Sequence, residues 1–165
     1  MEQLVKELET ILENELVVHK QLLEAARTMN HAIKAEDLAG VKKAAGKHDE
    51  LTCQIEGLEE KRLTANDELA LNLGAPGHVN LFRIIELMPK NLSAKLSGLR
   101  SKLKHTMAEL KKTTTSNQIL LNESLFIIAK TFELIDTASG KSTGYKYQGK
   151  KAPAKIKRTI INTVA

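Results

Sequence analysis

The chain has 165 residues, of which 42% are hydrophobic and only 3% aromatic, and its formal net charge is +5. This length allows one domain with a substantial core, and the single cysteine, Cys53, excludes a disulfide framework within the chain. No apolar run approaches the roughly 20 residues of a membrane span, and charges at helical intervals exclude a signal peptide, so we expect a soluble cytoplasmic protein.

The positive charge is concentrated at the C-terminal end. Seven basic residues and no acidic residue follow Asp136, which leaves 18 basic and 20 acidic residues in the rest of the chain. This nearly neutral body gives little support to nucleic-acid binding by the whole domain.

Residues 1–34 carry the strongest helical pattern. Apolar residues recur at spacings of three, four and seven, which predicts a long amphipathic helix with a face broader than a two-stranded seam. The stripe consists of Leu4, Leu8, Ile11, Val18, Leu22, Ala25, Met29 and Ala32.

Residues 37–73 are predicted to form a second helix, with Asp37 as its N-cap and Gly74 just after its end. Three glycines inside it, Gly40, Gly46 and Gly57, each cost about 1 kcal/mol relative to alanine. Their missing side chains either allow close helix contact or simply loosen the helix. At Cys53 the favoured interpretation is a small buried apolar residue.

A short helix is predicted over residues 81–88, where Pro89 stops or kinks it, and Asn91 is a candidate cap for a third long helix over 91–136. The leucine pattern of this helix slips in phase at the polar run 113–118. This run is interpreted either as an exposed or distorted piece of helix, or as a junction between a structural half and a binding half.

The predicted fold is therefore all-α: an extended antiparallel bundle of three long helices, with a short helix between the second and third. We expect this bundle to cover residues 1–138. Residues 139–165 are predicted to form a basic, partly apolar and flexible tail, which either stays disordered or folds on a partner.

The sequence holds little that suggests catalysis. It lacks phosphate-binding glycine motifs, and its five histidines share no metal-ligand spacing, so we expect no catalytic residue, no metal site and no cofactor. For the tail, three interpretations stay open: electrostatic contact with nucleic acid or an anionic membrane, a solubilising extension, or a segment that folds on a protein partner. Its apolar ending favours the last.

Several stretches, taken in order, resemble the FlgN-type family of flagellar export chaperones over most of the chain. The opening helix "LETILENELVVHKQLLEAARTMNHAIKAEDLAGV" and "IEGLEEKRLTANDEL", with Arg62, are similar to the family's first and second helices. "NQILLNESLFIIAKTFELI" is similar to its most recognisable stretch. "YKYQGK" resembles a Tyr-x-x-x-Gly segment, and "KRTIINTVA" resembles the family's short apolar ending.

The resemblance implies a non-catalytic cytoplasmic chaperone. Such a protein binds hook-associated (hook–filament junction) proteins before export and delivers them to the export gate at the inner face of the membrane. The expected cargo-binding residues are Leu121, Leu125, Ile128, Phe132, Ile156, Ile160, Ile161 and Val164. The expected contacts with the cytosolic domain of the gate are Tyr145, Tyr147 and Gly149.

Two other classes compete with this hypothesis. One is a structural coiled-coil or homo-oligomeric scaffold with no role in export. The other is a membrane- or nucleic-acid-associated module that uses the lysines, for which binding should fall steeply with salt.

Overall fold

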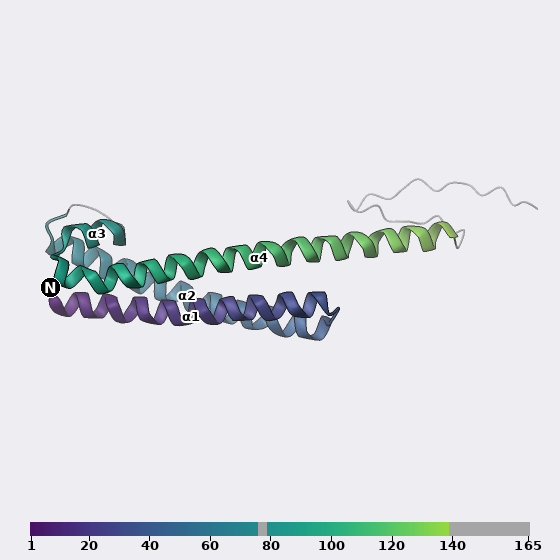
Figure 1. Ribbon diagram of the computed structural model, residues 1–165, viewed down its shortest axis with the longest axis horizontal. Coiled ribbons are helices and arrows are strands. Elements are labelled where there is room, and N and C mark those ends of the chain that lie inside the picture. Colours follow the sequence, from purple (N-terminus) through teal and green to yellow (C-terminus); the bar gives the residue numbers. More distant parts are fainter. Residues whose placement is uncertain (76–78, 139–165) are drawn as a thin grey trace, which may run out of the picture. The chain divides into compact units, whose positions relative to one another are not determined.

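The computed structural model describes residues 1–75 and 79–138, which form four helices (Figure 1). α1 (Glu2–Lys34), α2 (Leu38–Asn72) and α4 (Lys90–Ala138) are long, and the short α3 (Leu81–Leu87) lies between α2 and α4 in the chain. The predicted all-α fold is confirmed. The chain divides into two units, residues 1–120 and residues 121–165, and the division falls inside α4. The predicted tail, 139–165, lies outside the described residues, so its boundary stays a prediction.

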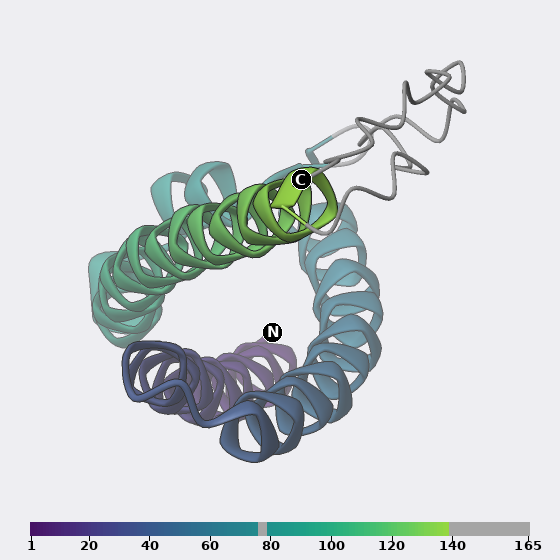
Figure 2. The ribbon, with the colours of Figure 1, turned by 90° about the vertical axis from the view of Figure 1, so that its right-hand side faces the viewer.

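A tight turn connects α1 to α2, so the two helices run side by side in opposite directions (Figure 2). Glu36 adopts a left-handed φ of +56°, and the Asp37 N–H donates to the Ala32 carbonyl at 2.9 Å. The Asp37 carboxylate then accepts a hydrogen bond from the Gly40 N–H at 2.9 Å. These bonds satisfy the free groups at both helix ends, which confirms Asp37 as the N-cap of α2.

The end of α2 repeats the same backbone motif with a glycine. Gly74 has a φ of +69°, and the Ala75 N–H donates to the Ala70 carbonyl at 2.9 Å. Glycine adopts this left-handed conformation without steric cost, so it ends α2 where the sequence predicts.

The start of α4 differs from the prediction. The proposed cap, Asn91, lies inside the first turn, because α4 already begins at Lys90. The Pro89 carbonyl accepts hydrogen bonds from the N–H groups of Leu92 and Ser93, both at 3.0 Å. A proline suits the start of a helix because it has no N–H to leave unsatisfied there. Another asparagine, Asn80, caps α3 through the Arg83 N–H at 3.0 Å.

Two apolar clusters form the core of residues 1–120. The larger one joins all four helices, and the smaller one joins α1 and α2 with Leu110 of α4 beside it. The larger cluster consists of Val5, Leu8, Ile11, Leu12, Leu16, Ala65, Leu69, Ile84, Met88, Leu96, Leu99 and Leu103. The smaller one consists of Val18, Leu22, Ala25 and Leu51.

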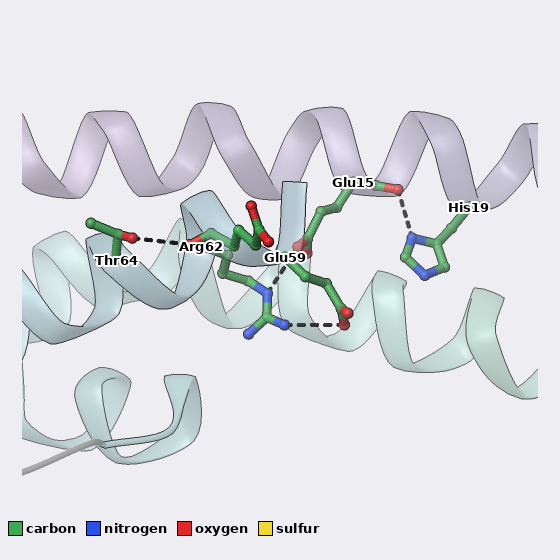
Figure 3. A network of polar contacts seen from close by, with 6 residues as sticks. Glu15, His19, Glu59, Arg62 and Thr64 are labelled. Atoms are coloured by element: carbon green, nitrogen blue, oxygen red, sulfur yellow. Dashed lines mark hydrogen bonds and ion pairs between the residues drawn. The ribbon is translucent and has the colours of Figure 1, made fainter. Parts of the chain in front are cut away.

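A network of polar contacts links α1 to α2 (Figure 3). The Arg62 Nε of α2 donates to the Glu15 Oε1 of α1 at 2.9 Å, and its Nη2 donates to Glu59 at 3.4 Å. The Glu15 side chain is only 4% exposed, against 21% for Arg62. The His19 Nδ1 lies 2.8 Å from the Glu15 carbonyl oxygen. A shift of α1 along α2 would leave the buried Glu15 carboxylate without its cationic partner. The ion pair therefore favours the observed register of the two helices.

Cys53 is exposed, so the interpretation of a buried apolar residue at this position is wrong. Leu51, two positions earlier, is buried in the smaller cluster. Two residues correspond to about 200° of helix rotation, so burying Leu51 turns Cys53 outward.

The glycines of α2 fall into two kinds. A Cβ at Gly40 would collide with the Asp37 carboxylate that caps the helix, whereas a Cβ at Gly46 or Gly57 would have no neighbouring atom within 4 Å. Gly40 therefore permits a close contact, and the other two only loosen the helix.

The polar run 113–118 is regular helix, so the predicted distortion is absent. Most of its side chains are exposed, but Asn117 is buried. The Asn117 Nδ2 donates to the Ala26 carbonyl at 2.8 Å, and its Oδ1 accepts from the Asn30 Nδ2 at 2.7 Å. The run thus contains a buried polar contact between α1 and α4, close to the point where the first unit ends.

Candidate functional site

The end of α4 exposes a group of large apolar side chains. Among the described residues, 17 large hydrophobic side chains are exposed, and nine of them lie between Ile119 and Ile135. The other eight are scattered over residues 1–107. Scattered apolar residues are ordinary on a protein surface, whereas a contiguous group marks an interaction site. This segment is therefore the candidate functional site.

The segment is helical because nothing in its sequence interrupts a helix. No glycine or proline occurs from Leu99 to Ala138. The hydroxyls of Thr131 and Thr137 donate to the carbonyls of Ile127 and Glu133, at 2.9 and 3.0 Å. These bonds satisfy the hydroxyls within the helix itself.

Four predicted cargo-binding residues follow one another along α4 at spacings of four, three and four. Leu121, Leu125, Ile128 and Phe132 are 36%, 54%, 51% and 65% exposed. This spacing places them on one face of the helix, and Ile135 extends that face by another turn. We call Leu121, Leu125, Ile128, Phe132 and Ile135 the first stripe.

The remaining predicted site residues fall beyond Ala138, outside the described residues. They are the tail residues Ile156, Ile160, Ile161 and Val164, and the gate residues Tyr145, Tyr147 and Gly149. Their assignments stay predictions.

Sequence reasoning missed further exposed apolar residues on other sides of the same turns. Ile127 and Leu134 are as exposed as the first stripe and lie seven residues apart. The signal was the unbroken apolar run from Leu125 to Ala129, because five consecutive residues of a helix point in all directions. We call Ile127, Thr131 and Leu134, which follow at spacings of four and three, the second stripe.

Charged and amide side chains lie on the side of the helix opposite the two stripes. We call Asn122, Glu123, Phe126, Lys130 and Glu133, which share this side, the polar strip. The Lys130 Nζ binds the Glu133 carboxylate at 2.7 Å and lies 6.0 Å from the centre of the Phe126 ring. The hydrogen bond from Lys130 lowers the pKa of the Glu133 carboxyl below its ordinary value, so this group stays ionised. Asn122, Glu123 and Phe126 also line a shallow hollow with Ile127.

The described residues offer no arrangement for metal chemistry. Within 1–75 and 79–138, no three His, Cys, Asp or Glu side chains come together as metal ligands. Over the same residues, no helix has both the length and the apolar character needed to cross a membrane.

The comparisons with known proteins identify the family. The chain matches the model of the family described as "FlgN protein" over residues 1–153. No curated protein and no solved structure matches it. The match covers most of the chain and all four helices. The chain therefore belongs to the FlgN family, the non-catalytic flagellar export chaperones for hook-associated proteins.

Proposed function

We propose that the first stripe of α4 is the surface on which this chaperone holds its hook-associated cargo. The observation that carries the proposal is the exposure of all five apolar side chains of the stripe, in a helix with no buried residue after Asn117. An amphipathic helix of the cargo that lies along this face would bury i, i+3, i+4 and i+7 side chains from both partners.

The physical gain comes from removing apolar surface from water. Burial of one large aliphatic or aromatic side chain contributes about 1.5–3 kcal/mol to the binding free energy. The entropy cost of association offsets part of this gain. Binding of this kind requires no catalytic group. Cover by the chaperone would also keep the apolar face of an unassembled cargo protein from aggregating.

The proposal also assigns roles to the tail, in cargo binding and in contact with the export gate at the membrane. Ile156, Ile160, Ile161 and Val164 supply a second apolar contact for the cargo, supported by their helical spacing in a segment that lacks acidic residues. Tyr145, Tyr147 and Gly149 contact the cytosolic domain of the export gate. The chaperone accordingly works in the cytoplasm and transiently at the inner face of the membrane.

The test compares a stripe variant with a matched surface variant. Ile128→Asp with Phe132→Asp places two charges on the first stripe, and we expect this chain to lose binding to a purified hook-associated protein. The control is Leu71→Asp on α2, which alters a side chain that is 74% exposed and far from α4's end in sequence. Equal binding by the stripe variant and the control would contradict the proposal, provided circular dichroism shows that both remain helical.

A second copy of this chain is the competing occupant of the stripe, because an exposed apolar helix face also favours self-association. Sedimentation of the free chain distinguishes the two. A monomer at working concentrations leaves the stripe available to cargo, whereas an oligomer that the Ile128→Asp and Phe132→Asp changes dissociate would show the stripe to be a contact between copies.

A further inference from the structure

The apolar surface at the end of α4 is wider than one helix partner needs. Counted at 100° per residue, the two stripes span roughly 180° of the circumference, from Leu134 through Ile135 to Leu125. A helix that packs on a single partner face typically carries an apolar face of roughly 100°. The width therefore exceeds what one cargo helix would cover.

α1 provides a reference for such a width within the same molecule. Its buried residues, from Ala32 through Leu8 to Leu16, span roughly 200° on the same count. α1 has two helix neighbours: Glu15 pairs with Arg62 of α2, and the Ala26 carbonyl accepts a hydrogen bond from Asn117 of α4. In this fold a buried face of that width corresponds to contact with two helices.

The second stripe can be covered without leaving a polar group unsatisfied. The only polar side chain in it is Thr131, and its hydroxyl already donates to the Ile127 carbonyl at 2.9 Å. When a partner covers this stripe and excludes water, the Thr131 hydroxyl therefore keeps its hydrogen bond within the helix. Burial of the polar strip would instead desolvate the ionised Glu133 and Lys130.

We propose that the end of α4 binds two amphipathic helices of the hook-associated cargo, one on each stripe. The proposal rests on the proposed function and adds the number and placement of the cargo helices. The resulting contact is a three-helix arrangement in which α4 supplies one helix and the cargo supplies two, while the polar strip faces water. A single-helix peptide from the cargo would then cover half of the apolar surface and bind weakly.

The first experiment replaces one stripe at a time in the full-length chain. Leu125→Ser with Phe132→Ser removes contacts of the first stripe, and Ile127→Ser with Leu134→Ser removes those of the second. We expect each pair to weaken binding of a purified hook-associated protein about 100-fold in Kd, since each large side chain contributes about tenfold or more. The control Leu71→Ser removes a 74% exposed apolar side chain from α2, outside both stripes, and should stay within about threefold.

The outcomes separate this inference from the proposed function. If only the first-stripe pair weakens binding, the two-helix arrangement is overturned while the cargo surface stands. If neither pair weakens it, both proposals fail.

A second measurement identifies what covers the second stripe. Hydrogen exchange of the cargo in the complex should slow in two separate segments, each showing helical spacing of its apolar residues. Protection of a single cargo segment would overturn the proposal, even if the second-stripe variant binds weakly.

Discussion

At the scale of single residues, the two partners of the Glu15–Arg62 ion pair differ in how deeply they are buried. The Glu15 side chain is almost fully buried, whereas the Arg62 side chain keeps a fifth of its surface in water and also reaches Glu59 at 3.4 Å. Loss of the arginine would strand a buried carboxylate, but loss of the glutamate would leave an arginine with another partner and access to solvent. A buried carboxylate without a partner is the costlier of the two.

We therefore predict different costs for the two single substitutions. Arg62→Met should lower the free energy of unfolding by about 3–5 kcal/mol, because it leaves the Glu15 charge buried alone. Glu15→Met should cost about 1 kcal/mol, and the double variant should lie within about 1 kcal/mol of the wild type, since two apolar groups replace the pair. Urea unfolding followed by circular dichroism measures all three.

The difference between the two single variants carries this prediction. Equal costs for Arg62→Met and Glu15→Met would show that burial of the Glu15 charge does not decide the stability of this contact between α1 and α2.

At the scale of elements, α2 contains more glycines than any other described helix. Gly46 and Gly57 lie within it, and a Cβ at either position would meet no neighbouring atom within 4 Å. Gly46→Ala and Gly57→Ala should each raise the free energy of unfolding by about 1 kcal/mol, because alanine loses less backbone entropy in a helix. The same urea titration measures the change.

Gly40→Ala is the matched control with the opposite sign. Its Cβ would collide with the Asp37 carboxylate, so the substitution should disrupt the N-cap and cost about 1 kcal/mol despite the better helix propensity. Stabilisation by all three alanines would mean that the Asp37 cap adjusts freely.

The element boundaries could be predicted because local chemistry sets them. The start of α2 needs an acceptor for its free N–H groups, which the Asp37 side chain supplies. The end of α2 needs a residue with a left-handed backbone, which Gly74 supplies. The errors at Cys53 and Asn91 have a different origin. Which side of α2 faces the core depends on tertiary packing, which the residue type at Cys53 does not reveal. Pro89 has no N–H to leave unsatisfied, so α4 can begin at Lys90, one residue before Asn91.

The candidate site could be predicted in part for a similar reason. The spacing of Leu121, Leu125, Ile128 and Phe132 identifies one face of a helix from sequence alone. Ile127 and Leu134 were missed because a continuous apolar run conceals two faces until the exposure of each side chain is known. The burial of Asn117 was equally hidden, since its partners Ala26 and Asn30 lie about 90 residues earlier in the chain.

At the scale of the whole molecule, the two units differ in what supports their helices. Residues 1–120 contain both apolar clusters, whereas none of the described residues from 121 onward is buried. Most of the stability of a helix in a protein comes from tertiary packing, and local opening is cheapest where few apolar contacts are broken. The described part of the second unit should therefore open far more often than the first.

Hydrogen exchange of the free chain tests this difference. Amides of residues 121–138 should exchange at least about 100-fold faster than those around Leu96 and Leu103, because opening them breaks no core contact. A purified hook-associated protein should slow exchange in 121–138 and leave the turns around Leu96 unchanged.

If 121–138 exchange slowly in the free chain and more slowly still as concentration rises, a second copy covers the stripes. Slow exchange at every concentration would instead mean that the chain covers them itself, and cargo would have to displace that contact.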